Sequence, residues 1–279
     1  MFGRPQRVSV PASPARPQLD LSGPRLRRAL ESLVEGADAL GGVERYVDAL
    51  KLKAQVFQEA LGEEALTAGR IDVGVLRPLC AFMPTVRRRV TPWLEEPAFG
   101  TLQAAVLELL APTNDTSGTD ARIRRFCASF PRDDGHRWTR DFAAELLHNV
   151  DPERFPLMTR WVWDMDANTG VLREIWHGPD VDHTTIRVHD DYETFLVLRE
   201  ELAQFLATNG VFRDVPQMVD MLCAQVYAHY ICEQGGSYLR ADFSAPEDPM
   251  QHTRRMLGLD GVRSGDGRAR FAAIDGEAH

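Results

Sequence analysis

The stretch that decides the fold reads Asp141-Phe-Ala-Ala-Glu-Leu-Leu-His-Asn-Val150, followed directly by Asp151-Pro-Glu-Arg-Phe-Pro-Leu-Met-Thr-Arg-Trp-Val-Trp-Asp164. Its first half places apolar residues at helical spacing and predicts a helix over 138–150. In the second half we expect a new helix to begin at Pro156, since proline is favoured in a first turn. Four of the five tryptophans lie within 138–176, at positions 138, 161, 163 and 176, which indicates either a binding site or the packing centre of the core.

Two segments further along carry the strongest helical pattern. The first, 190–208, begins at an acidic pair that suits the N-terminus of a helix. The second, 214–234, has Asp214 as its N-cap and is predicted to end before Gly235. Strand-like composition appears only at about 170–189. We therefore expect a mainly α, multi-helix, bundle-like globular domain with at most one small β-hairpin at about 170–189.

The domain organisation follows from the distribution of proline, glycine and polar residues. Residues 1–22 are rich in proline and are predicted to form a disordered N-terminal tail. Residues 23–258 form the predicted globular domain, with a polar turn cluster at 113–119 as a possible internal boundary. Residues 259–279, rich in Gly, Asp and Arg, are predicted to be a flexible C-terminal tail.

The overall charge and the cysteines limit the class of function. The chain has 279 residues and a formal charge of −9, which disfavours broad contact with a phosphate backbone. Its positive charge is almost all arginine, clustered at 25–28, 87–89 and 122–125. The four cysteines form no Cys-x-x-Cys pair, and no apolar run is long enough for a membrane span. A cytoplasmic protein that does not enter the membrane is expected.

The helix predicted over 214–234 carries the best pair of polar residues. His229 and Glu233 are four residues apart and lie on the edge of its apolar face. Such a pair can bind a divalent metal or exchange protons with a substrate. The alternative, which we favour, is that the two side chains bond to each other near the end of the helix.

Other polar groupings are less specific. Glu145-x-x-His148 has the spacing of ligands in di-iron helical bundles, but no second Glu-x-x-His occurs in the chain. His177, His183 and His189 lie in an Asp-rich stretch, where loop histidines could bind a metal. For both groupings the favoured interpretation is structural or solvent-exposed, so no metal ligand is assigned.

The tryptophan-rich segment supplies the remaining candidates. Arg160 is followed by Trp161 and Trp163, which point in different directions on a helix, so that one can be buried while the other stacks on a ligand. The alternative is that both rings are core. If there is a ligand pocket, we place it between this segment and 214–234, with Arg160, Trp161, Trp163, His229 and Glu233 as the binding residues.

A helix ending in Leu146-Leu147-His148, followed by Asp-Pro-Glu-Arg-Phe-Pro and a Trp-rich segment, resembles a connection in helical DNA-glycosylase-like domains. The resemblance implies a helical fold and association with nucleic acid. The chain lacks that family's Gly-bearing hairpin and a catalytic Lys or Asp in matching context, so no functional residue is carried over.

The sequence favours a helical interaction or regulatory protein that binds a protein partner or a small-molecule ligand. It identifies neither a catalytic residue nor a cofactor, and it does not indicate an oligomeric state. A metal-dependent enzyme and a nucleic-acid-associated module are the alternatives.

Overall fold

The computed structural model describes residues 16–69, 71–112, 115–178, 183–238, 249–259, 262–265 and 268–271, with the backbone alone for 234–238 and the last two ranges. Within them, helices dominate, as predicted. The elements are α1 (Gly23–Asp38), α2 (Val43–Leu61), α3 (Glu63–Thr67), α4 (Val73–Cys80), η1 (Thr91–Leu94), α5 (Phe99–Leu110), α6 (Thr119–Ala128), η2 (Asp134–His136), α7 (Trp138–Val150), α8 (Val171–Glu174), α9 (Tyr192–Thr208), α10 (Val215–Tyr238), α11 (Pro249–Met256), β1 (Val262–Gly265) and β2 (Arg268–Phe271).

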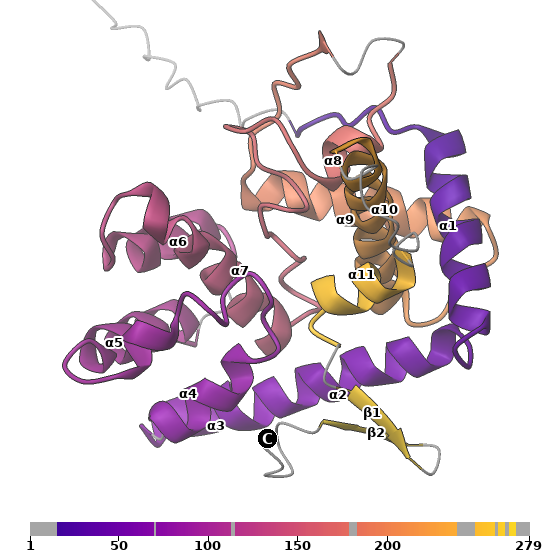
Figure 1. Cartoon of the computed structure of the whole chain (residues 1–279). Coiled ribbons are helices and arrows are strands. Elements are labelled where there is room, and N and C mark those ends of the chain that lie inside the picture. Colours follow the sequence, from indigo (N-terminus) through magenta and orange to yellow (C-terminus); the bar gives the residue numbers. More distant parts are fainter. Residues whose placement is uncertain are drawn as a thin grey trace, which may run out of the picture.

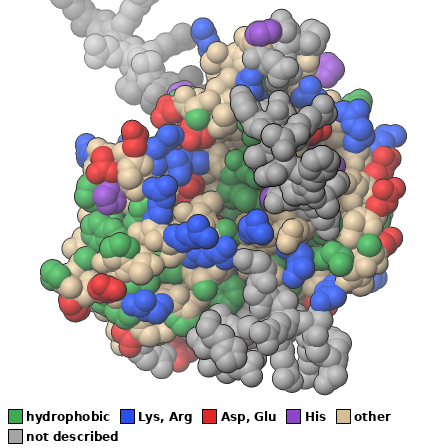
Figure 2. All heavy atoms as spheres, viewed as in Figure 1, with side chains coloured by type: hydrophobic (Ala, Val, Ile, Leu, Met, Phe, Trp, Pro, Cys, Tyr) green, Lys and Arg blue, Asp and Glu red, His purple; other side chains and the backbone are tan. Residues whose placement is uncertain are grey.

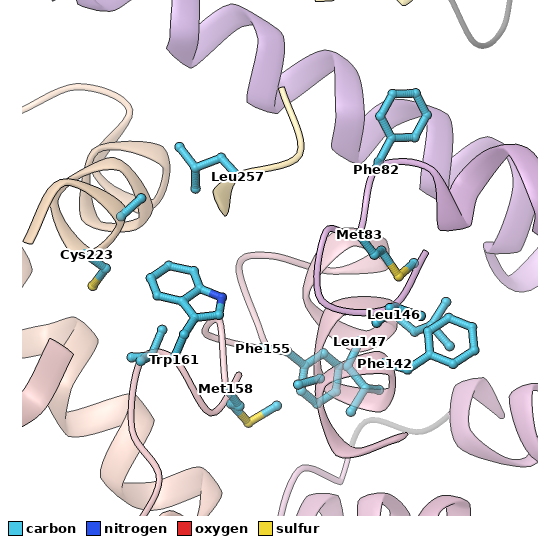
Figure 3. Packing of buried hydrophobic residues seen from close by; sticks show 14 of the residues in the cluster. Phe82, Met83, Phe142, Leu146, Leu147, Phe155, Met158, Trp161, Cys223 and Leu257 are labelled. Carbon is cyan, nitrogen blue, oxygen red and sulfur yellow. The ribbon is translucent and has the colours of Figure 1, made fainter. Parts of the chain in front are cut away.

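Helix α7 lies in the middle of the molecule, and α2 runs along one edge (Figure 1). Helices α3–α6 gather on one side of α7, and α1 with α8–α11 on the other. Helix α7 packs against α2, α5 and α6, while α10 packs against α1, α9 and α11. One continuous cluster of buried apolar side chains joins the two groups and includes residues from both sides of 113–119 (part of it in Figure 3).

The helices predicted over 138–150 and 190–208 are confirmed by α7 and α9. Asp191 caps α9, because its side chain accepts a hydrogen bond of 3.0 Å from the backbone nitrogen of Thr194. The predicted end of α10 before Gly235 is wrong, since the helix continues to Tyr238. Helix α10 as a whole packs against α1, α9 and α11, and tertiary packing can outweigh the low helix propensity of glycine.

The helix expected to begin at Pro156 is absent, and 156–164 is irregular. The Thr159 carbonyl accepts hydrogen bonds from the nitrogens of residues 162 and 163 within the segment, and other backbone groups bond to distant segments. The backbone nitrogen of Arg160 donates to Asp141 Oδ1 at 2.8 Å. The carbonyls of Trp161 and Val162 each accept a 3.0 Å hydrogen bond, from the nitrogens of residues 171 and 172. The segment is therefore held between α7 and α8 as a loop.

The small hairpin that the sequence allows at about 170–189 does not form in the described part of that range. Residues 171–174 form the one-turn helix α8, and 184–190 contain no strand; residues 179–182 lie outside the described residues. The backbone of Trp176 pairs with Leu21 rather than with 184–188. The described hairpin is instead β1–β2, in the C-terminal stretch, with Val262 opposite Phe271.

Residues next to both predicted tail boundaries contact the folded part of the chain. At the N-terminal end, Ser22 N donates to the Ile175 carbonyl at 2.7 Å, so the segment before α1 is held against α8. At the C-terminal end, Leu259 is buried. Gly258 before it has φ +71°, and a Cβ there would lie 1.9 Å from the carbonyl oxygen of Phe82. Residues 1–15 and 272–279 lie outside the described residues.

Candidate functional site

A cleft of about 710 Å³ lies where α1, α8 and α10 meet. We call it the arginine cleft because three arginines line it. Two of the residues predicted to bind a ligand, His229 and Glu233, belong to its walls. The lining residues are Arg25, Arg28, Ala29, Arg173, Glu174, Ile175, Val226, His229, Tyr230 and Glu233.

Two arginines of the cleft contact backbone oxygens, and the third is exposed to solvent. Arg25 Nη1 donates to the Glu174 carbonyl at 2.8 Å, and Arg173 Nη1 donates to the Thr184 carbonyl at 3.1 Å. The side chain of Arg28 is exposed and forms no hydrogen bond or ion pair within the described part of the chain. A carbonyl satisfies a single donor of a guanidinium, which has five, so Arg28 and Arg25 can donate to an added anion.

His229 is held in the wall by a network that spans three helices. Its Nε2 lies 2.9 Å from Ser32 Oγ of α1 and 3.1 Å from Gln225 Nε2 of α10. The Gln225 side chain also accepts a 2.7 Å hydrogen bond from Thr253 of α11. The expected bond between His229 and Glu233 is therefore replaced by these contacts, and Glu233 is exposed at the rim.

A second hollow, of about 580 Å³, lies beside α6 and α7, and three of the four arginines that line it pair with aspartates. We call it the paired hollow. Arg160 Nη2 is 2.8 Å from Asp141 Oδ2, and Asp141 is buried. Arg137 and Arg140 line the same hollow and pair with Asp164 at 3.1 Å and Asp190 at 2.9 Å. Arg160, predicted to bind a ligand, thus has an internal partner and lies outside the arginine cleft.

The two predicted tryptophans are core residues. Trp163 is 0 % and Trp161 5 % exposed. Trp163 Nε1 donates to the Val188 carbonyl at 3.0 Å, whereas Trp161 Nε1 is buried without a hydrogen-bond partner among the described residues. Trp161 packs near Cys223 and Leu257 (Figure 3). The five predicted binding residues are therefore separated: two line the cleft, one lines the paired hollow and two are buried.

The sequence interpretation missed a buried charged cluster where α2, α7 and α10 meet. Lys53 Nζ lies 3.5 Å from Glu145 Oε2 and donates to the Leu257 carbonyl at 3.1 Å. Burial raises the pKa of Glu145, and Lys53 opposes that rise. His148 Nε2 lies 3.1 Å from Asp220 Oδ2. Burial lowers the pKa of His148, but the Asp220 carboxylate and the Phe155 carbonyl together outweigh it, so the pKa lies above its ordinary value.

A signal for this cluster is present in the sequence. Lys53 falls on the apolar stripe of 43–61, three residues after Leu50 and four before Phe57. Glu145 and His148 likewise interrupt the apolar face of 138–150. A charged residue on an inward-facing stripe requires a buried partner, and that requirement could have paired these residues.

In the parts of the chain that the structure describes, no three His, Cys, Asp or Glu side chains are grouped so as to hold a metal ion. His177, His183 and His189 are all exposed. The four cysteines are free, with Cys80 and Cys223 buried. No helix among the described residues is long and apolar enough to cross a membrane.

The chain was compared with models of known protein families, with curated proteins and with solved structures, and none of them matches.

Proposed function

We propose that this protein is a binding protein whose arginine cleft takes a small ligand with a discrete anionic group, a phosphate or a carboxylate. The observation that carries the proposal is the set of arginines from α1 and α8 around one cleft, with Arg28 lacking a partner in the described part of the chain. A guanidinium presents its donors in a planar fork that matches the oxygens of these anions.

The rim of the cleft favours a compact anion over a long polyanion. Glu174 and Glu233 line the same cleft, so an extended chain of phosphates would meet like charge there. A ligand with one anionic group avoids these carboxylates and uses the arginines alone. Tyr230 and Val226 add an aromatic and an apolar surface for the rest of the ligand.

The walls of the cleft are fixed before any ligand arrives. The contacts of Ser22 and Arg25 with the carbonyls of 175 and 174 tie α1 to α8. The contacts of His229 with Ser32 and Gln225 tie α1 to α10. A preformed site loses less conformational entropy when it binds, which supports a binding role for this cleft. A cytoplasmic site of action fits the free cysteines.

Calorimetric titration with inorganic pyrophosphate at low ionic strength tests the proposal. Arg28→Glu should weaken binding at least about tenfold, because a charge-assisted hydrogen bond contributes about 1.5–3 kcal/mol. Arg27→Glu is the matched control, since Arg27 is equally exposed on the same helix but lines a different hollow. Equal affinities of the two variants, or no binding by the unmodified protein, would overturn the proposal.

Binding of nucleic acid is a second candidate function, and one observation favours it. On the face shown in Figure 2, arginine and lysine side chains gather over the middle, and acidic side chains lie mainly towards the edges. The cluster at 122–125 adds little, because Arg122 donates to backbone carbonyls and Arg125 pairs with Glu108 at 2.8 Å.

Salt dependence separates the two functions. Contact with several phosphates predicts that affinity for a labelled single-stranded oligonucleotide falls steeply between about 50 and about 200 mM salt. The anion-binding proposal predicts weak binding of this probe at either salt concentration, with pyrophosphate bound more tightly. Tight, steeply salt-dependent binding of the oligonucleotide that is unchanged by Arg28→Glu would favour the second function.

A further inference from the structure

Both ring nitrogens of the buried residue His148 face hydrogen-bond acceptors. His148 lies on α7 and is 8 % exposed. Its Nδ1 is 2.9 Å from the Phe155 carbonyl oxygen, and its Nε2 is 3.1 Å from Asp220 Oδ2 on α10. A carbonyl oxygen can only accept, and an ionised carboxylate can only accept. To satisfy both contacts, each ring nitrogen must therefore carry a hydrogen.

We propose that His148 is a buried imidazolium that holds α10, through Asp220, and the loop that contains Phe155 against α7. We call these two contacts the clamp. Because the ring can lose a proton, the strength of the clamp depends on pH. A neutral imidazole carries one N–H, so after deprotonation one acceptor loses its donor. If that acceptor is Asp220, a carboxylate 8 % exposed is left without its cation. The structure thus contains a proton-dependent contact between two of its central helices.

The charged groups around His148 come from each element packed against it. Asp220 of α10 favours the charged ring, while Lys53 of α2 opposes it. Glu145, one turn earlier on α7, lies 3.5 Å from Lys53 and so offsets that positive charge. Cys223 is buried one turn along α10 from Asp220. Two cations and two anions balance in this cluster, which makes a charged His148 compatible with burial.

The direction of the pH response follows from the pKa of His148, which is higher in the folded chain than the ordinary value of 6.5. The contribution of protonated His148 to the free energy of unfolding is complete below pH 6.5. It is lost as pH rises through the pKa that His148 has in the folded state. Burial also raises the pKa of Glu145. Deprotonation of Glu145 therefore also lowers the stability as pH rises, beginning near the ordinary pKa of 4.5. The step that belongs to His148 is thus the one that begins near its ordinary pKa of 6.5 and depends on Asp220.

The clamp acts on the helix that lines the arginine cleft, because α10 also carries His229 and Tyr230. A loosened α10 would move one wall of that cleft, so the affinity for pyrophosphate should fall over the same pH range. This consequence rests on the proposed function. The protonation of His148 and its effect on stability do not, and they are measured separately.

Nitrogen NMR chemical shifts of the imidazoles in the unmodified protein give the direct test. At about pH 6, near the ordinary histidine pKa, His148 should show two protonated ring nitrogens, and this state should persist to higher pH than in a free histidine. One unprotonated ring nitrogen at that pH would overturn the proposal. This result needs no variant and is independent of ligand binding.

Chemical unfolding between about pH 6 and about pH 9 gives the second test. The ratio of folded to unfolded protein should fall about tenfold for each unit by which the folded state raises the pKa of His148. Asp220→Asn should remove this step, whereas Glu145→Gln should keep it. His136→Gln is the matched control, because His136 also pairs with an aspartate, Asp133 at 2.8 Å, but at the surface. A step that is the same in Asp220→Asn and the unmodified protein would contradict the clamp.

Discussion

Two hollows in this molecule are lined by arginines, and they differ in what the guanidinium groups face. In the paired hollow, Arg137, Arg140 and Arg160 each have an aspartate within ion-pair distance. In the arginine cleft, Arg25 donates to a carbonyl, and Arg28 has no partner in the described part of the chain. Three of the four arginines that line the paired hollow therefore serve internal cohesion, whereas Arg28 in the arginine cleft remains available to a ligand.

The comparison teaches that the partner of an arginine, and not its presence in a hollow, indicates its role. An aspartate neutralises the guanidinium and occupies the fork that an anionic ligand would use. A backbone carbonyl does neither. In a surface rich in arginine, most of the guanidinium groups can thus form internal ion pairs that stabilise the fold, as Arg160 does with Asp141.

The largest expected effect concerns the paired hollow. Arg160→Ala should lower the free energy of unfolding by about 3–5 kcal/mol, because it leaves the buried Asp141 carboxylate without its cation. Urea unfolding measures this. The double variant Arg160→Met with Asp141→Asn should recover much of the loss, since the neutral amide needs no charge partner and its oxygen still accepts from the backbone nitrogen of residue 160. An Arg160→Ala protein as stable as the unmodified one would show that the pair is not structural.

A smaller effect is expected from the two buried tryptophans, to which the same reasoning applies. Trp163→Phe removes the donor to the Val188 carbonyl, whereas Trp161→Phe removes an N–H that has no partner among the described residues. Both lose the same ring volume, so each is the control for the other. Trp163→Phe should be the less stable by about 1–3 kcal/mol, the cost of an unpaired buried polar group. Equal free energies of unfolding in urea for the two variants would contradict the different roles given to the two N–H groups.

The sequence predicted the parts of the fold that local chemistry determines. Helices α7 and α9 follow from apolar spacing and, for α9, from the Asp191 cap. It failed at 156–164 and 171–174, two segments that bond to each other through the nitrogens of 171 and 172 and the carbonyls of 161 and 162. The nitrogen of Arg160 bonds to a carboxylate 19 residues earlier, and no local pattern reveals such a contact.

The candidate site was predictable only in part. His229 and Glu233 were found, because helical spacing places them together on one edge of α10. Arg25 and Arg28 were noted only as members of a charge cluster, since the cleft forms when α1 meets a helix about 200 residues away. Ser32, which holds His229, carries no signal of its own in the sequence.

The most direct measurement compares matched neutral substitutions in the two hollows. Calorimetric titration with pyrophosphate would be performed on the unmodified protein, on Arg28→Gln and on Arg137→Gln, each of which loses one positive charge. The account predicts that Arg28→Gln binds at least about tenfold more weakly, while Arg137→Gln stays within about twofold of the unmodified protein. Equal loss in both variants, or loss only in Arg137→Gln, would contradict the claim that the arginine cleft is the anion site.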